Sequence, residues 1–456
     1  MMKRPEIEQV WRYIDDHKEE YLALLKKFCS QPSVSAQNWG MREMAELVRQ
    51  TVSGLGGNGR LIETAGNPIV FGQLDYGRKR TLMLYNHYDV VPPEPYEQWE
   101  TPPFEPTIKG DRIVARGVAD NKGSLLSRYC AIDAYQKVHG ELPINVKFLA
   151  EGEEEIGSVH LGDFVKANRD LVTADAIIWE GGSKDINHGP LQVALGVKGV
   201  TCFELRCRCI DTDMHSMNAA IVPNAAWRLV WALSTMKNDK NEIIIDGFWD
   251  DVPEYTQEEL DCLNSFTYNE KDMLEAIGRE QFINGLTGLE LKKQLFFRPS
   301  MTIQGIQSGY TGEGAKTVLP AYAFCKVDIR TVMGQTPERV LQQVRRHLDN
   351  HGFQDIEIVP GNSTIPYRGR LDNPLAQAII RNVEDVYGMP PAVHLNMAGS
   401  SGMGFLCTLT GIPAVCYGVF NDDSRCHAPN EYIFLEDFFN GIKLSAAVIH
   451  DFAEVE

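Results

Sequence analysis

The stretch TLMLYNHYD (residues 81–89) runs from an apolar, strand-like segment directly into a histidine and an aspartate. Strand-like runs of the same kind follow at INVKFLA (144–150) and DAIIW (175–179), and each is followed directly by a glutamate. A helical pattern over residues 122–138 separates the first two runs. Strands that alternate with helices predict an α/β layer with a largely parallel sheet.

The middle of the chain follows another order. It predicts, in sequence, strand 197–210, helix 223–238, strands 300–307 and 320–331, helix 336–350 and strand 354–359. This β-α-β-β-α-β order indicates a ferredoxin-like sandwich. The α/β style then resumes with helix 373–387, strand 412–419 and helix 435–453. We therefore expect a catalytic domain in two parts, 1–198 and 367–456, interrupted by a lid and dimerisation domain at 199–366.

Composition narrows the class of protein. A chain of 456 residues is too long for one ordinary core, which agrees with two domains. Its net charge of -18 argues against nucleic acid or an anionic membrane as a partner. No apolar run approaches the length of a membrane span, and the ten cysteines lack the paired spacing of a disulfide framework. These features predict a cytoplasmic protein with reduced thiols.

Five short segments with histidines or carboxylates follow apolar runs or turns. They are Asn86-His87-Tyr88-Asp89, Ala119-Asp120-Asn121-Lys122-Gly123, Glu151-Gly152-Glu153-Glu154-Glu155-Ile156-Gly157-Ser158, Trp179-Glu180-Gly181-Gly182 and Cys426-His427-Ala428-Pro429-Asn430-Glu431. In an open α/β sheet, ligands gather at the carboxyl ends of the strands. Buried carboxylates are costly without a counter-charge, so the five segments together predict a centre with two divalent cations.

The residue types suit that chemistry. His87 can ligate a cation, and Asp89 can hydrogen-bond its other ring nitrogen. Asp120 can bridge two cations through its two oxygens. Of the adjacent Glu154 and Glu155, one can bind a cation while the other takes a proton from a metal-bound water. Each segment alone also fits an ordinary surface turn, helix cap or solvated helix start.

A glycine-rich stretch, Gly54–Gly59, matches the G-x-G-x-x-G dinucleotide pattern. It follows a predicted helix instead of a strand and opens no helix, so the required context is missing. We interpret it as a helix end and turn, which excludes a nicotinamide-dependent dehydrogenase.

At these motifs the sequence resembles the aminoacylase, carboxypeptidase-G and carnosinase family of co-catalytic metallopeptidases, closest to its cytosolic non-specific dipeptidase branch. The resemblance covers essentially the whole chain. It implies a mostly parallel-sheet, zinc-exopeptidase-like catalytic domain with an inserted ferredoxin-like α+β domain, and two divalent ions per chain (zinc, manganese or cobalt). It also implies a cis bond between Asp120 and Asn121. The implied roles are His87 and Glu180 on one metal, Glu155 and His427 on the other, Asp120 as the bridge, Glu154 as general base and Asp89 orienting His87.

The resemblance also assigns residues in the second half of the chain. His215, which alone would be read as structural, corresponds to a histidine that reaches into the partner subunit's active site of a homodimer. Arg330 and Thr317 match groups that hold the substrate's carboxylate, a planar anion suited to a guanidinium fork. Gly399 and Ser400 match a loop that lines the substrate.

The implied reaction is hydrolysis of an amide bond by a metal-bridged water, in small substrates with a free carboxylate, most simply dipeptides. One departure favours an alternative. Relatives of the carnosinase type carry an acid where this chain has Met397, and a methionine cannot pair with a substrate ammonium. An N-acyl-amino-acid deacylase on the same scaffold is therefore the second hypothesis. A binding protein without activity is a third, and the presence of Glu154, Asp89 and every proposed ligand argues against it.

Overall fold

The computed structural model describes residues 4–184 and 189–454, which form two compact units. Unit 1 comprises the described residues up to Gly196, then Arg368–Asn396, and those from Phe405 onward. Unit 2 comprises Val197–Tyr367 and Met397–Gly404. The division predicted from the sequence places Met397–Gly404 in the catalytic domain, whereas the structure places this segment in unit 2. The assignment of unit 2 as a lid and dimerisation domain stays a prediction.

Unit 1 is built on a mixed, mostly parallel sheet, as predicted. Its strand order is β1-β2-β6-β3-β7-β19-β9-β18. In that order the strands are Arg60–Ile62, Ile69–Leu74, Asn145–Glu151, Thr81–His87, Ala176–Trp179, Ala414–Cys416, Gln192–Ala194 and Ala392–His394. β6, β3, β7 and β19 run parallel to one another. Almost every residue of β3 and β6 is buried, which is typical of central strands covered on both faces.

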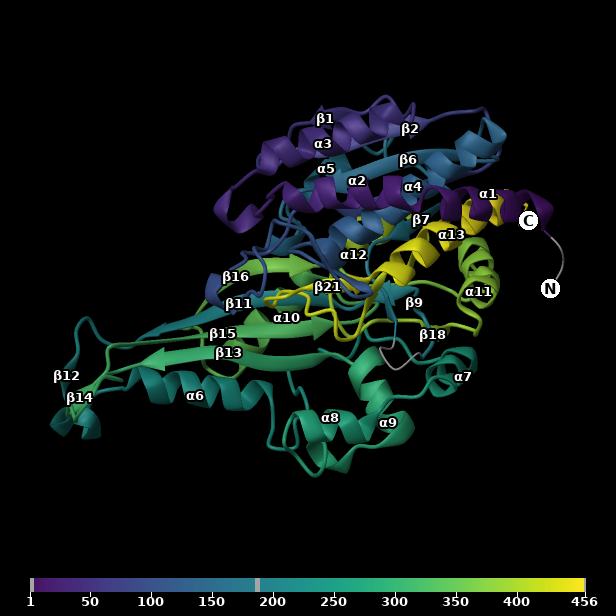
Figure 1. The fold of residues 1–456 in the computed structure, drawn as a ribbon. Coiled ribbons are helices and arrows are strands. Elements are labelled where there is room, and N and C mark those ends of the chain that lie inside the picture. Colours follow the sequence, from purple (N-terminus) through teal and green to yellow (C-terminus); the bar gives the residue numbers. More distant parts are fainter. Residues whose placement is uncertain (1–3, 185–188, 455–456) are drawn as a thin grey trace. The chain divides into compact units, whose positions relative to one another are not determined.

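Helices enclose this sheet (Figure 1). They are α1 Pro5–Asp16, α2 Lys18–Ser30, α3 Met41–Gly54, α4 Gly123–His139, α5 Leu161–Ala167, α11 Pro374–Tyr387, α13 Leu435–Phe452 and α12 Met403–Thr410, whose first two residues belong to unit 2. α13 packs against α1, α4 and α11. The single helix predicted over 5–29 is broken at His17, where the backbone leaves helical geometry and the ring Nδ1 lies 2.8 Å from the carbonyl oxygen of Tyr13.

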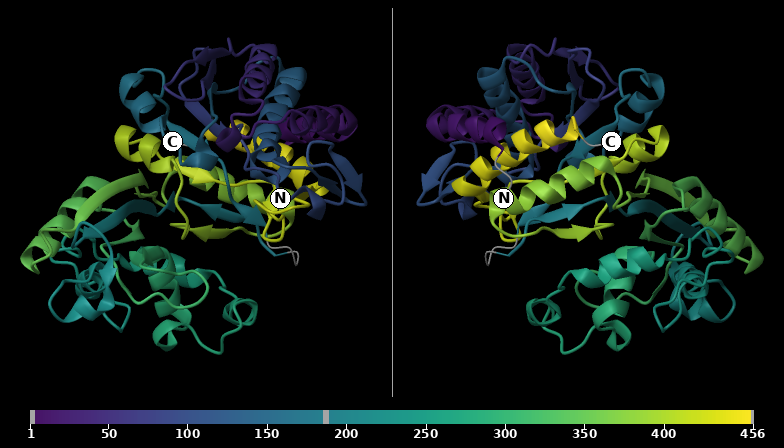
Figure 2. Two further views of the ribbon diagram at one scale, coloured as in Figure 1. Left: turned by 90° about the vertical axis from the view of Figure 1, so that its left-hand side faces the viewer. Right: turned by 90° about the vertical axis from the view of Figure 1, so that its right-hand side faces the viewer.

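Unit 2 has the predicted ferredoxin-like core. Its sheet order is β13-β15-β11-β16, all antiparallel, and two helices connect the strands. Burial alternates along β11, so one face of the sheet packs against α6 and α10. Figure 2 shows these elements in teal to yellow-green from two sides. The bounds are β11 Gly199–Arg208, α6 Ala225–Met236, β13 Ser300–Ser308, β15 Tyr322–Thr331, α10 Pro337–Asn350 and β16 Glu357–Thr364.

An insert between α6 and β13 contains three short helices that were not predicted: α7 Gln257–Ser265, α8 Glu270–Ala276 and α9 Gly288–Lys292. The capping box of Thr256 and Glu259 was the sequence signal for α7. The remaining strands are β4 Thr107–Lys109, β5 Arg112–Val114, β8 Ser183–Lys184, β10 Gly196–Val197, β12 Met214–His215, β14 Val318–Leu319, β17 Tyr367–Arg368, β20 Phe420–Asn421 and β21 Tyr432–Phe434.

Within residues 4–184 and 189–454, none of the helices combines the length and the apolar character needed to cross a membrane. All ten cysteines lie within the described residues, and none of them forms a disulfide bond.

Candidate functional site

The carboxyl ends of three parallel strands bring the first predicted segments together. β3 is paired with both β6 and β7, and His87 at its end lies opposite Glu151 at the end of β6. Glu154 and Glu155 follow β6 in the next turn, and Glu180 directly follows β7. The sheet therefore collects these side chains at one edge, as expected for parallel strands.

Asp120 lies between the two predicted histidines. Its Oδ1 is 3.0 Å from Nε2 of His87, and its Oδ2 is 3.3 Å from Nε2 of His427. Nε2 of His427 is also 3.1 Å from Oε2 of Glu155. One ligand atom from each of His87, Asp120 and Glu155 lies within 4.8 Å of the others. The two oxygens of Asp120 thus face different histidines, which is the arrangement that a bridging carboxylate requires.

The backbone is unusual at two of these positions. The peptide bond between Asp120 and Asn121 is cis, as the resemblance implied. His427 has a φ of 65°, in the left-handed region that residues other than glycine seldom adopt. A non-glycine residue in that region is held there by its surroundings, and such residues cluster at functional sites.

Asp89 connects His87 to the acidic turn. Its fully buried carboxylate accepts hydrogen bonds from the backbone N–H of Glu154 (3.3 Å) and Glu155 (3.1 Å). Nδ1 of His87 lies 3.4 Å from Oδ1 of Asp89 and 3.1 Å from its carbonyl oxygen. The carboxylate of Asp89 thus lies beside the ring of His87 and also holds the turn that carries both glutamates.

Glu180 completes the cluster from β7. Its Oε2 accepts a 3.3 Å hydrogen bond from the amide of Asn121, and its Oε1 accepts one of 3.2 Å from the indole of Trp179. Asn121 in turn contacts Asn86 at the end of β3. Asn121 thus positions the carboxylate of Glu180, which is predicted to bind the same metal ion as His87.

Burial of these carboxylates so close together shifts their pKa values. Burial raises the pKa of Glu154 well above its ordinary value, and the charges of Glu180 and Asp120 add to the rise. Burial also raises the pKa of Glu155 to about 7. Hydrogen bonds to Asp120 and Glu155 raise the pKa of His427 to about 10. The carboxylates at this edge therefore require positive charge beside them.

The donor set fits a divalent cation. Oε1 of Glu155 is buried and has no hydrogen-bond partner in the described part of the chain, although a buried carboxylate oxygen is costly to leave unpaired. Imidazole nitrogens and carboxylate oxygens are ligands for zinc, manganese and cobalt.

Glu431 is a structural residue of this site whose role the sequence did not indicate. Its buried carboxylate accepts hydrogen bonds from the backbone N–H of Gly117 (2.8 Å), Ala119 (2.8 Å) and Asp120 (3.0 Å), and from Arg116 Nη1 (2.8 Å). It lies four residues after His427, so one short segment supplies both a predicted ligand and the anchor of the Asp120 loop.

Arg128 is a second such residue. Its buried guanidinium donates to the carbonyl oxygens of Tyr85, Trp179 and Tyr417 and to Oδ1 of Asn86. It thereby ties together the ends of β3 and β7 and the segment after β19. The signal in the sequence was an arginine within the apolar stretch of a predicted helix, where an unpaired charge would be very costly.

The predicted substrate residues form two separate groups in unit 2. His215 and Thr317 belong to or adjoin the β12–β14 pair, with 3.4 Å between Nε2 and Oγ1. Arg330 donates a 2.9 Å hydrogen bond to Ser400 Oγ, and Gly399 adjoins Ser400. Both His215 and Thr317 are exposed.

The length of β15 separates these two groups. Arg330 is near the carboxyl end of this strand, whereas β14 precedes its first residue, Tyr322 (Figure 1). Eight residues of strand span roughly 26 Å. His215 and Arg330 of one chain therefore cannot contact the same small substrate.

Two further features of the molecule do not belong to this centre. Asp246, His347 and His351 also come close enough to hold a cation, but Nδ1 of His347 accepts the backbone N–H of Asp246, and its Nε2 lies 3.0 Å from Thr235 Oγ1. That histidine is already engaged on both ring nitrogens, which is typical of a structural role.

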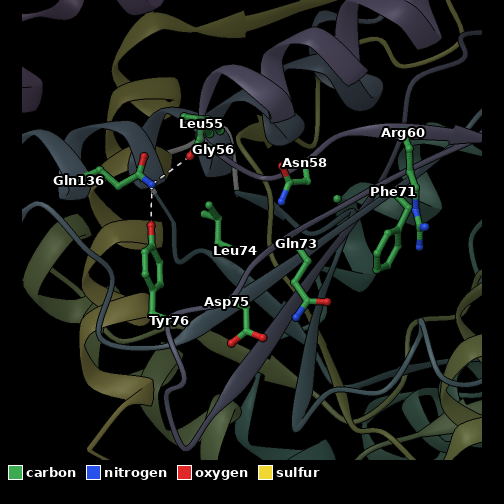
Figure 3. Close-up of a pocket in the computed structure, with 11 residues that line it drawn as sticks. Leu55, Gly56, Asn58, Arg60, Phe71, Gln73, Leu74, Asp75, Tyr76 and Gln136 are labelled. Carbon is green, nitrogen blue, oxygen red and sulfur yellow. Dashed lines mark hydrogen bonds between the residues drawn. The ribbon is translucent and has the colours of Figure 1, made fainter.

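The glycine-rich turn after α3 lines a pocket at the edge of the sheet in unit 1 (Figure 3). The amide of Gln136 closes one side of it through hydrogen bonds to Tyr76 Oη and the carbonyl oxygen of Leu55. The turn leads from a helix into β1, so the geometry of a dinucleotide site is absent from this described segment. None of the predicted site residues lines the pocket.

The chain is similar to known metallopeptidases over nearly its whole length. Residues 83–451 match the model of Peptidase family M20/M25/M40. The Cys-Gly metallodipeptidase dug1 of Schizosaccharomyces pombe is 28% identical, over 98% of this chain and 99% of that protein. The Beta-Ala-His dipeptidase of Homo sapiens is 25% identical, over 98% and 93% respectively. The solved structure of an M20 family metallo-carboxypeptidase from Sulfolobus solfataricus has a TM-score of 0.90 and 36% identity, covering 96% of this chain and 100% of that one.

Proposed function

This chain belongs to peptidase family M20/M25/M40 and is a metallopeptidase, and from that premise we propose that it hydrolyses dipeptides with a free carboxylate at a centre of two metal ions. The observation that carries the proposal is the position of Asp120 between His87 and His427. The names of the dipeptidase relatives support the substrate class.

The proposed ligands are those of the sequence prediction. His87 and Glu180 would hold one ion, Glu155 and His427 the other, and Asp120 would bridge them. The unpaired buried oxygen of Glu155 supports this set. When bound, the ions would polarise the scissile carbonyl and lower the pKa of the attacking water. Zinc is the proposed ion, with manganese or cobalt as alternatives.

Glu154 is the proposed general base. It takes a proton from the water that attacks the carbonyl carbon and returns this proton to the leaving nitrogen as the C–N bond breaks. Asp89 accepts a hydrogen bond from the backbone N–H of Glu154 and thereby positions this residue. The carboxylate of Asp89 also holds the ring of His87 through Nδ1, the nitrogen that does not face Asp120. His215 of the partner subunit would stabilise the oxyanion.

The substrate's carboxylate is proposed to bind Arg330, with Gly399 and Ser400 as further substrate groups of the same chain. Thr317 lies beside His215 and would, like His215, contact the substrate in the partner's centre. The hydrogen bond from Arg330 to Ser400 supports a shared role for the strand and the loop. Met397 favours a second candidate, an N-acyl-amino-acid deacylase, because no acid at this position receives a substrate ammonium. Both candidates release a carboxyl-terminal amino acid, so they share the same chemistry.

A panel of substrates separates these candidates. We expect the zinc- or manganese-loaded enzyme to hydrolyse Ala-Leu and Ala-Phe, and kcat/KM for N-acetyl-Leu and N-acetyl-Phe measures the contribution of the free amine. The amidated dipeptide Ala-Phe-NH₂ is the control, because it lacks the carboxylate that Arg330 binds. Release of amino acid by mass spectrometry is the measurement. Hydrolysis of the amide at the same rate as the acid would contradict the proposal, and faster turnover of the acetylated substrates would favour the deacylase.

Asp120→Ala should lower the metal content of both positions, because one carboxylate serves both. Elemental analysis of enzyme purified without chelator should find up to two ions in the wild type and fewer than one in the variant. Asp246→Ala is the matched control, since it removes an aspartate from the other histidine cluster and should leave the metal content unchanged. Two tightly bound ions in Asp120→Ala would rule out the bridging role.

We propose that the active form is a homodimer formed through unit 2. An exposed apolar surface on and before α6 supports this, with Ile221 85% exposed, Trp227 57% and Trp231 55%. β13 is one of the two edge strands of the sheet, and most of its residues are exposed. Edge strands and apolar faces of this kind are usually covered, and a second copy of the chain would bring His215 to the partner's centre.

A further inference from the structure

A cavity of about 690 Å³ lies wholly within unit 2, between the insert and the start of β13. Its volume is in the range of roughly 300–1,000 Å³ that is typical of small-molecule sites. The lining residues come from several distant segments, including Lys198, the residues around Ile244, the segment after Phe282 and the Arg298–Met301 stretch. Arg330 and Ala398 also line it, so the cavity is continuous with the proposed carboxylate-binding group and its loop.

Positively charged side chains predominate among the charged residues of the lining. Lys198, Lys237, Lys240, Arg298 and Arg330 all contribute, and Glu242 is the one acid among the described lining residues. This excess of positive charge contrasts with the net charge of -18 for the chain. A cavity of this sign attracts an anion, such as the carboxylate of a peptide.

Two of these lysines fix the wall of the cavity. Nζ of Lys198 donates a 2.6 Å hydrogen bond to the carbonyl oxygen of Arg298, and Nζ of Lys237 donates one of 2.8 Å to that of Met301. Burial lowers the pKa of Lys237. The segment that opens β13 is thus held at Arg298 and at Met301 by lysines from two other segments of unit 2.

The rest of the lining is apolar and partly uncovered. Ile244 is 43% exposed, Trp249 42% and Ile283 57%, although each is a large apolar side chain. The indole N–H of Trp249 donates to the carbonyl oxygen of Ile243, so its polar atom is satisfied within the chain. Several uncovered apolar side chains around one cavity indicate an apolar occupant.

We propose that this cavity receives the side chain of the substrate's carboxyl-terminal residue and selects bulky apolar side chains over glycine. The inference rests on the proposed function, because Arg330 is the group assigned to the carboxylate. Because Arg330 itself lines the cavity, a residue whose carboxylate binds Arg330 would place its side chain at the cavity. An apolar side chain there would cover the surface formed by Ile244, Trp249 and Ile283.

The test compares two substrates that differ only in this side chain. In the wild type, kcat/KM for Ala-Phe should exceed that for Ala-Gly. Ile244→Asn should lower this ratio by at least about tenfold, because removing apolar contact from a substrate pocket costs roughly 10–200-fold per methylene. Ile277→Asn is the matched control: Ile277 is 47% exposed in the same insert and does not line the cavity. It should leave the ratio unchanged.

A binding measurement separates this inference from the proposed function. Calorimetry with free L-phenylalanine and with glycine needs no hydrolysis, so it remains informative for an enzyme that cleaves neither dipeptide. We expect L-phenylalanine to bind the wild type and Ile277→Asn, and to bind Ile244→Asn at least about tenfold more weakly. An unchanged ratio of kcat/KM together with equal affinities in Ile244→Asn would overturn the inference.

Discussion

Glu154→Gln is expected to reduce kcat by roughly 10²–10⁴-fold, the usual effect of losing a general base. An amide cannot accept the proton of the attacking water, whereas it nearly preserves the volume of the carboxylate. The fold should be unaffected, because the described hydrogen bonds at this position involve the backbone of Glu154: its N–H donates to Asp89, and its carbonyl oxygen accepts from the N–H of Gly157. The measurements are turnover of Ala-Phe and metal content by elemental analysis.

Two neighbouring glutamates provide the controls. Glu155→Gln should lose metal as well as activity, because Glu155 faces His427. Glu153→Gln should keep both, because the Glu153 carboxylate accepts the backbone N–H of Asn67 and lies 2.8 Å from Nδ1 of His160, outside the cluster. If Glu154→Gln loses its metal while Glu155→Gln retains it, the two roles must be exchanged.

Subunit exchange should restore activity to a mixture of two nearly inactive variants, Glu154→Gln and His215→Ala. If His215 serves the partner's centre, a heterodimer contains one site with both lesions and one site with neither. Each heterodimer should therefore reach up to about half of the wild-type rate, from the count of intact sites alone. The roughly 26 Å of β15 between the His215 group and the Arg330 group motivates this expectation.

The matched control mixes Glu154→Gln with Glu155→Gln. Both lesions then lie in the metal centre of their own chain, so each site of the heterodimer carries one lesion and no activity should return. Differently tagged subunits would show that heterodimers have formed. An inactive mixture of Glu154→Gln and His215→Ala with proven heterodimers would mean that His215 acts within its own chain or is structural.

Much of the fold could be predicted because its signals are local. The apolar runs that end in His87, Glu151 and Trp179 identify parallel strands, and parallel strands bring their carboxyl ends to one edge. The pairing of β3 with β6 and β7 confirms this arrangement. The order of strands and helices in unit 2 was likewise sufficient to predict its ferredoxin-like core.

The remainder depends on residues that are distant in sequence. Glu431 binds the loop of Asp120 from more than three hundred positions away. The local sequence around such a carboxylate does not identify a hydrogen-bond partner that is so distant. The short helices α7 to α9 lack the long apolar periodicity on which helix prediction rests. The cavity beside Arg330 draws on several separate segments, so it exists only once unit 2 has folded.

The carboxylate of Glu431 has a consequence for how the enzyme acquires its ions. By accepting the N–H groups of Gly117, Ala119 and Asp120, it ties the loop that bears Asp120 to the residue that precedes β21. The order of the loop is thus a product of chain folding, and the incoming cation does not have to supply it. A molecule stripped of its ions should keep the arrangement of the proposed ligands. Rebinding of the ions should therefore require their diffusion to the site and the release of protons, but no refolding of the chain.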